Sequence, residues 1–82
     1  MKSIKYFTAS WCPPCKQFKP IMKEIEREGH SISFIDVDHD EGNLAETYHI
    51  ASVPTSIVEE NGKEIERFIG PLPKKEVLEK LI

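Results

Sequence analysis

Hydrophobic residues fall into two patterns along the chain: short runs rich in β-branched and aromatic residues, and longer stretches with helical spacing. The short runs are typical of β-strands and cover residues 3–8, 32–37, 55–58 and 63–69. The sequence Glu59-Glu60-Asn61-Gly62 separates the last two runs. Because Asn-Gly between two β-rich runs is a strong hairpin signal, we expect these two strands to pair antiparallel.

The longest stretch with helical spacing runs from Pro13 to Glu28. Its apolar residues lie three and four positions apart on one stripe: Cys15, Phe18, Ile21, Met22 and Ile25. Pro13 suits the first helical turn, where its missing N–H costs nothing, and Gly29 is a typical stop. Pro20 lies inside the same helix. We expect it to kink the helix, because proline removes a backbone hydrogen bond and crowds the preceding turn.

Two shorter helices are predicted around residues 43–49 and from Pro73 onward, which completes the order β-α-β-α-β-β-α. Because the first crossover carries a helix, the first two strands are expected to pair parallel through a right-handed connection. The length of 82 residues leaves no room for a second core. We therefore predict one α/β domain, residues 1–82, with a central mixed four-stranded sheet flanked by helices.

Composition narrows the classes of protein to which the chain can belong. Hydrophobic residues make up 39% of the chain and charged residues 30%, which is typical of a soluble globular domain. No apolar run approaches the ~20 residues that span a bilayer. The N-terminal residues Met1-Lys2-Ser3-Ile4-Lys5 lack the apolar core of a secretion signal. We therefore expect neither an integral membrane protein nor a disordered one.

The net charge of −3 is distributed unevenly. Residues 1–27 carry six Lys and Arg against two Glu, whereas residues 28–66 carry ten acidic residues against one Lys. A solvated surface with an acidic flank explains this distribution. A modest electrostatic preference for partners near the basic N-terminal third is the second interpretation. Because no basic cluster is interleaved with aromatic residues, we expect no nucleic-acid partner.

The only two cysteines, Cys12 and Cys15, lie between a predicted strand end and a predicted helix start. A disulfide that closes so short a loop contributes little to stability, so chemistry is the better reason for the pair. Cys12 is expected at the helix N-terminus, where unpaired N–H groups and the helix dipole favour a thiolate. Cys15 follows one turn along the same face, so the two sulfurs can join or separate with little backbone change.

Metal binding is the alternative interpretation of these cysteines. Structural zinc takes four ligands, but the chain has no second cysteine pair, and its three histidines have no characteristic spacing. The acidic run 36–42 suggests a calcium loop. However, Glu41 and Thr47 hold the places where an EF-hand needs glycine and glutamate. We therefore expect redox chemistry and no metal.

Several side chains near the cysteines have two interpretations. Trp11 adjoins the reactive thiol on a loop, which favours partial exposure and contact with a substrate over burial in the core. Tyr48 is interpreted as a core residue. Lys16, Lys19 and Lys23 are interpreted as a solvated helix face, although Lys16 would also favour a thiolate at the nearby cysteine.

The segment Trp11-Cys12-Pro13-Pro14-Cys15-Lys16 resembles the Trp-Cys-Gly-Pro-Cys-Lys motif of thioredoxins and their glutaredoxin-like relatives, with Pro13 in place of the usual glycine. Pro20 matches the helix-kinking proline of that family. Residues 48–55, Tyr-His-Ile-Ala-Ser-Val-Pro-Thr, resemble the segment that holds the family's cis-proline. Asn61-Gly62-Lys63 and Gly70 fall where the family has its hairpin turn and its groove glycine. The resemblance covers nearly the whole chain and implies a minimal thioredoxin fold.

This resemblance implies a thiol–disulfide oxidoreductase that reduces protein disulfides. Cys12 would be the attacking thiolate, and the more buried Cys15 would resolve the mixed disulfide, so that the redox-active disulfide Cys12–Cys15 replaces any cofactor. The backbone of Val53 would pair with an extended substrate segment. The resemblance implies a substrate groove formed by Trp11, Pro13, Pro14, Val53, Pro54, Gly70 and Pro71.

The expected partners are protein disulfides and an electron donor, either an NADPH-dependent thioredoxin reductase or glutathione. We expect a cytoplasmic monomer that contacts neither membranes nor nucleic acid, although a mature periplasmic chain would have the same composition. A non-catalytic thioredoxin-like binding module, which docks a partner in the groove beside Pro54, is the alternative function. The intact Cys12 and Cys15 argue against it.

Besides Pro13, two further positions depart from the family pattern. Tyr6 occupies the place of the family's buried aspartate, and Phe34 that of the lysine paired with it. We therefore expect packing to replace the charged pair, and the proton of Cys15 to leave through water or Cys12. Pro13, one of the two residues between the cysteines, bears on the reduction potential, because for this two-electron couple about 30 mV corresponds to 1.4 kcal/mol.

Overall fold

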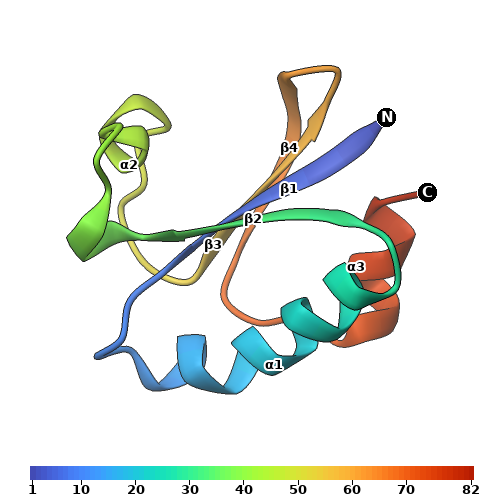
Figure 1. Ribbon diagram of the computed structural model, residues 1–82, viewed down its shortest axis with the longest axis horizontal. Helices are drawn as coiled ribbons and strands as arrows, with labels where there is room; N and C mark the ends of the chain where they lie inside the picture. Colours follow the sequence, from blue (N-terminus) through green and yellow to red (C-terminus); the bar gives the residue numbers. More distant parts are fainter.

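A single mixed sheet with strand order β2-β1-β3-β4 organises the chain in the computed structural model, which describes all residues from 1 to 82 (Figure 1). The elements follow one another in the predicted order, with one short 3₁₀ helix added after β2. Their bounds are β1 Lys2–Thr8, α1 Pro13–Arg27, β2 Ser31–Asp36, η1 Val37–His39, α2 Leu44–Thr47, β3 Thr55–Glu60, β4 Lys63–Ile69 and α3 Lys74–Lys80. The predicted α/β fold is confirmed.

The pairing of the strands also follows the prediction. β1 pairs parallel with β2, which places Tyr6 opposite Phe34, and antiparallel with β3 on its other side. β3 and β4 form the antiparallel hairpin. Asn61 and Gly62 connect them with φ values of 53° and 85°. A tight hairpin needs positive φ at both central residues, and Asn and Gly are the residues that tolerate it, so the turn explains why these two stand here.

Helices α1 and α3 cover one side of the sheet, whereas α2 lies apart from them at the other end of the molecule (Figure 1). The predicted stripe of α1 faces inward, with Cys15, Phe18, Met22 and Ile25 buried. Pro20 lies within this helix, which runs unbroken through it. The main core consists of Ile4, Tyr6, Phe18, Met22, Ile25, Ile32, Val58 and Val77. None of the three α-helices has the length and apolar character required to cross a membrane.

Aromatic packing fills the position of the family's buried charged pair. The Tyr6 ring is fully buried and meets the rings of Phe18 and Phe34 edge-on, with centroids 5.6 Å and 5.7 Å away. Its hydroxyl donates to the carbonyl oxygen of Cys15 at 3.1 Å. Burial raises the pKa of the Tyr6 hydroxyl, which keeps it a neutral donor. This hydrogen bond ties β1 to the first turn of α1.

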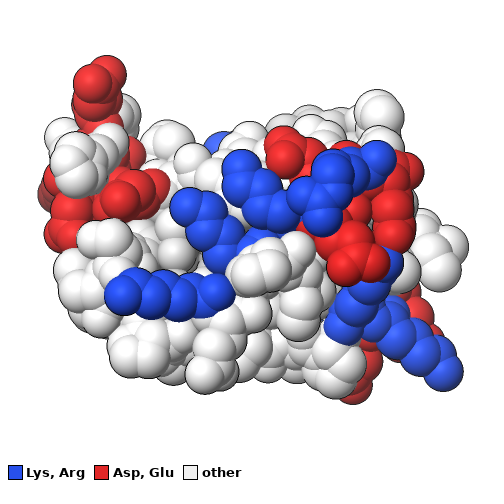
Figure 2. All heavy atoms as spheres, turned by 60° about the horizontal axis from the view of Figure 1, so that its bottom comes forward, with Lys and Arg blue, Asp and Glu red and all other residues white.

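Charged side chains are segregated on the surface (Figure 2). The acidic residues of the segment 36–46 gather at the end of the molecule that carries η1 and α2. Lysine and arginine side chains spread over the face formed by α1. The uneven charge seen along the sequence is therefore also uneven in space.

Removing the Tyr6 hydroxyl tests the role of this packing. We expect Tyr6→Phe to lower the free energy of unfolding by about 1 kcal/mol, because the ring contacts remain and one buried hydrogen bond is lost. Tyr6→Asp should cost more than about 3 kcal/mol, because it leaves a cavity and a buried carboxyl with no cationic partner. Chemical denaturation of both variants measures this. Equal stability of Tyr6→Asp and the parent protein would contradict the assignment.

Candidate active site

The chain converts from strand to helix at a disulfide between Cys12 and Cys15. The Cα atoms of the two cysteines lie 5.2 Å apart. Cys12 is the N-cap residue of α1, and its Sγ accepts a hydrogen bond from the backbone N–H of Cys15 at 3.2 Å. An N-cap acceptor satisfies one of the unpaired donors at a helix start, and the helix dipole stabilises negative charge there. The predicted position of Cys12 at the helix N-terminus is confirmed.

The two sulfurs differ in their access to solvent. Cys15 is fully buried, whereas Cys12 keeps 4% of its surface exposed. Ala9, Val37 and Val53 pack around the pair and leave it in an apolar environment. An incoming sulfur therefore reaches Cys12 before Cys15, in agreement with the expected order of burial.

Segments far apart in the sequence meet at the disulfide. The Val53–Pro54 peptide bond is cis, and the carbonyl oxygen of Val53 lies 3.6 Å from the Sγ of Cys12. The N–H of Gly70 donates to the carbonyl oxygen of Pro54 at 2.8 Å. Gly70 has a φ of 84°, a left-handed conformation that glycine adopts without steric cost. Four of the predicted site residues thus lie next to one another: Cys12, Val53, Pro54 and Gly70.

An apolar hollow of about 240 Å³ lies beside Trp11. The Trp11 side chain is 64% exposed, as expected, and its Nε1–H donates to Oδ2 of Asp38 at 2.7 Å. This hydrogen bond fixes the edge of the indole while leaving its apolar surface open. The hollow is lined by Trp11, Val37, Ala45, Ile50, Ala51, Ser52 and Val53.

The remaining predicted groove residues occupy less central places. Pro13 and Pro14 form the exposed first turn of α1, and Pro71 is exposed after Gly70. Sequence reasoning had missed Val37 and Asp38 as site residues. Their position could have been predicted from the expected parallel pairing of β1 and β2, because the residues that follow parallel strands meet at one edge of the sheet.

A second hollow, of about 360 Å³, reaches the buried Cys15. Lys16 and Lys19 of α1 line one part of it, and Asp36 at the end of β2 lines another. Its lining is mixed polar and apolar, with Thr8 and Ser10 among the polar residues. Cys15 is fully buried but lies at the wall of this hollow, so solvent comes close to it there.

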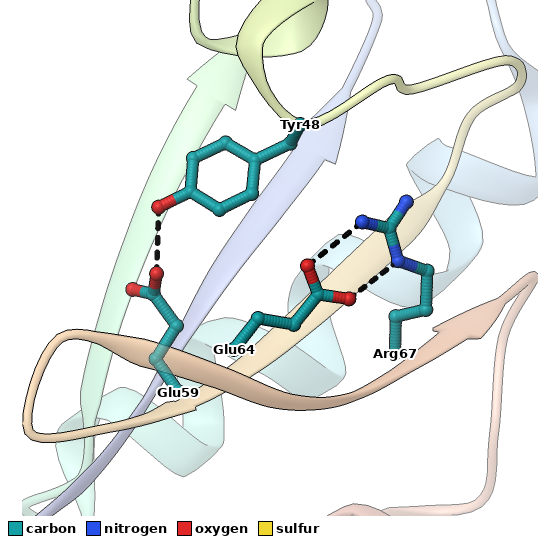
Figure 3. Close-up of polar contacts among 4 residues, drawn as sticks. All are labelled: Tyr48, Glu59, Glu64 and Arg67. Atoms are coloured by element: carbon teal, nitrogen blue, oxygen red, sulfur yellow. Dashed lines mark hydrogen bonds and ion pairs between the residues drawn. The ribbon is translucent and has the colours of Figure 1, made fainter.

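A hydrogen bond from Tyr48 holds the wall of the apolar hollow to the sheet (Figure 3). The Tyr48 hydroxyl donates to Oε2 of Glu59 at 2.6 Å, and Lys5 forms an ion pair with the other carboxylate oxygen. The Tyr48 ring packs against Phe7 with centroids 5.9 Å apart. Because Tyr48 ends α2 just before the segment 50–53 that lines the hollow, this contact positions the groove wall. Tyr48 is thus half-buried with a polar partner, and the expectation of a plain core residue was only partly right.

Glu59 is only 2% exposed, yet it is held in its charged form. Burial opposes ionisation of its carboxyl group, but the hydrogen bonds from Lys5 and Tyr48 outweigh burial and lower its pKa. The same hydrogen bond to Glu59 raises the pKa of Lys5. On the neighbouring strand β4, Arg67 binds Glu64 through two hydrogen bonds of 2.6 Å and 2.8 Å (Figure 3).

The lowered pKa of Glu59 predicts a specific loss of stability in acid. A carboxyl group with a lowered folded pKa stabilises the fold above its unfolded pKa of about 4.5, and this contribution disappears as pH falls through the folded pKa. We expect Glu59→Gln to flatten the decline in unfolding free energy between about pH 5 and about pH 2. The matched control is Glu60→Gln, at the exposed neighbouring residue. Identical acid profiles for the parent protein and Glu59→Gln would contradict this role.

A disulfide at a helix N-terminus, beside an exposed apolar hollow, defines a thiol–disulfide redox site. Residues 2–82 match the family model Thioredoxin. The chain is 38% identical over 81 residues to the thioredoxin of Mycoplasmoides gallisepticum, and the match covers 98% of this chain and 81% of that protein. It is 40% identical over 77 residues to the thioredoxin of Chlamydia trachomatis, with coverages of 93% and 74%.

Solved thioredoxin structures have the same fold. The thioredoxin of Fasciola hepatica superposes with a TM-score of 0.86 at 28% identity, over 98% of this chain and 77% of the other. A mutant thioredoxin from Halobacterium salinarum NRC-1 gives a TM-score of 0.85 at 28% identity, over 99% and 71%. The chain belongs to the thioredoxin family.

Membership of this family defines the general function. The chain is a disulfide oxidoreductase of the thioredoxin type with a redox-active cysteine pair. Thioredoxins generally need no cofactor, and the structure contains no cluster of three or more metal-ligating side chains. The likeness to glutaredoxins stays a prediction. The chain spans only 54% of the length of another relative, the rice thioredoxin H2-1, with which it is 38% identical over 77 residues.

Proposed function

We propose that this protein reduces protein disulfides by dithiol exchange through Cys12 and Cys15. The observation that carries the proposal is the placement of the Cys12 Sγ, which caps α1 and accepts the N–H of Cys15 at the rim of an apolar hollow. The same N–H that contacts the sulfur in the disulfide would stabilise a thiolate after reduction. Because the thiolate is the nucleophile in thiol–disulfide exchange, Cys12 is the attacking residue.

The first step forms a mixed disulfide. The Cys12 thiolate attacks one sulfur of the substrate disulfide, a bond forms between the two sulfurs, and the substrate S–S bond breaks. The second substrate sulfur leaves as a thiolate and takes a proton from water. Cys15 is fully buried and does not compete for the substrate in this step.

The second step releases the substrate. Cys15 gives its proton to water in the adjoining hollow, and its sulfur attacks the Sγ of Cys12. The bond between Cys12 and the substrate breaks, and the departing sulfur is protonated. Two electrons and two protons have then passed to the substrate, and the protein holds the Cys12–Cys15 disulfide that the structure contains.

An extended segment of the substrate would bind along Val53. The backbone N–H and C=O of Val53 form no backbone hydrogen bond within the protein, although Val53 lies beside the disulfide. Backbone groups that pair with no neighbouring strand, next to an apolar hollow, are the features that strand addition uses. Trp11 would contribute apolar contact area on the side of the hollow where its indole is held by Asp38.

For regeneration of the dithiol we propose an NADPH-dependent thioredoxin reductase, since members of this family act with that donor. Glutathione is the second donor to test. We further propose that the protein acts as a monomer in the cytoplasm, where such a donor keeps dithiols reduced. The non-catalytic binding module is the weaker alternative, because both cysteines are present and their sulfurs are bonded.

Single cysteine substitutions distinguish the two roles. With an oxidised protein substrate such as insulin, Cys15→Ser should accumulate a mixed disulfide through Cys12, because no second sulfur is present to release it. Cys12→Ser should accumulate none, because Cys15 is buried. Non-reducing electrophoresis and intact mass detect the adduct, and the parent protein should accelerate the reduction of insulin by dithiothreitol. Failure to accelerate would favour the binding module, and adducts on Cys15 would reverse the assigned roles.

The electron donor is tested by supplying each candidate alone. We expect NADPH with thioredoxin reductase to sustain insulin reduction, because that enzyme acts on a cysteine pair of this type. Glutathione with its reductase should sustain it far less, since the family model that matches this chain and the relatives described above are thioredoxins. NADPH consumption measures both rates. Faster consumption with glutathione would overturn the proposed donor.

A further inference from the structure

Four basic residues form a stripe along one flank of α1, and we refer to them as the basic stripe: Lys16, Lys19, Lys23 and Arg27. Their spacings of three, four and four positions bring them to one side of the helix. All four are exposed. At about 1.5 Å per residue the stripe is about 16 Å long. Figure 2 shows basic side chains across this face, with acidic residues toward both ends.

The positive charge of the basic stripe is only partly offset within the molecule, through a longer-range interaction between Arg27 and Glu24. None of its four residues forms an ion pair, although the surface contains other ion pairs. Glu24 and Glu28, on another flank of α1, are both bound to Lys74 of α3. Glu26, the remaining acidic side chain of this helix, forms no ion pair with the four basic residues, so the stripe keeps an excess of positive charge facing solvent.

The basic stripe begins at the redox site. Lys16 and Lys19 line the hollow that reaches Cys15, and Phe34 of β2 lines the same hollow. The Nζ of Lys23 lies 4.2 Å from the centroid of the Phe34 ring. The stripe therefore runs beside β2, an edge strand of the sheet. Asp36, which also lines the hollow, uses its Oδ1 to accept the N–H of Asp38 and places its Oδ2 3.6 Å from His39.

The opposite end of the site has the opposite charge. The segment 36–46, which includes η1 and α2, carries five acidic residues and no Lys or Arg. A protein bound over the disulfide is therefore exposed to positive potential on the α1 side and negative potential on the α2 side. Such a field orients a charged partner and changes its rate of encounter.

We propose that the basic stripe selects disulfide substrates that carry acidic residues beside the disulfide, and that it seats those residues along α1. This inference rests on the proposed function and specifies the substrate class of the same site. A segment of about five extended residues matches the length of the stripe. Carboxylates placed there would meet Lys and Arg, whereas the same carboxylates over α2 would meet like charge.

Synthetic peptides test the preference directly. Three peptides carry the same small disulfide ring, followed by four Glu, four Lys or four Gln, and dithiothreitol supplies the electrons so that no charged donor takes part. We expect kcat/KM for the Glu peptide to exceed that for the Lys peptide about tenfold at about 0.05 M salt. The ratio should approach one at about 0.5 M salt, because screening shortens the range of surface electrostatics.

Charge reversal on the stripe supplies the second measurement. The variant Lys23→Glu with Arg27→Glu, which leaves the two lysines at the disulfide in place, should lower the Glu-to-Lys peptide ratio to about one or below. The matched control is Lys63→Glu with Lys75→Glu. These residues, on β4 and α3, are exposed and form no ion pair, so this variant should keep the parent ratio.

The outcomes separate the two proposals. No reduction of any peptide overturns dithiol exchange and, with it, this inference. Reduction of all three peptides at equal kcat/KM leaves dithiol exchange standing and overturns the role of the stripe. A preference for the Glu peptide that does not change with salt concentration also overturns the role of the stripe. So does a preference that the control variant, Lys63→Glu with Lys75→Glu, removes to the same extent as the stripe variant. The salt dependence of the parent protein decides the question even if a variant fails to fold.

Discussion

The rest of the molecule depends on the short connection, residues 9–12, through which the chain passes from β1 to α1. It requires a helix to begin at the carboxyl edge of a buried strand, and Cys12 provides the cap. A sulfur in that position serves the helix as an acceptor and serves chemistry as an anion held by a backbone N–H. The structural need and the proposed reaction are met by one contact.

The two sides of the sheet support this site in different ways. On the helix side, Tyr6 combines ring packing with a hydrogen bond to the carbonyl group of Cys15, so the core positions the first turn of α1. On the other side, Glu59 accepts from Tyr48 and pairs with Lys5, which holds the groove wall. The buried charge lies away from the sulfurs. Aromatic packing therefore occupies the helix side at Tyr6 and Phe34, and the buried charged group lies across the sheet at Glu59.

The electrostatics of the surface extend the site beyond the sulfurs. The thiolate proposed at Cys12 lies where positive charge from α1 meets negative charge from the segment after β2. A helix dipole acts over about one turn, whereas a row of uncompensated charges acts over about a Debye length. The reactivity of the sulfur and the proposed choice of substrate therefore depend on electrostatic effects of different range along the same helix.

Local sequence patterns were sufficient to predict the element order, the hairpin and the position of Cys12 at a helix start. Each of these depends on local chemistry: Asn-Gly permits positive φ, and the apolar stripe of α1 has one helical period. Only the packed sheet shows that Asp38 holds Trp11 and that Tyr48 binds Glu59, whereas the family resemblance had already placed Val53 in the groove. These two contacts join residues 27 and 11 positions apart. Such pairings arise only when strands take their places in a sheet, and no local pattern encodes them.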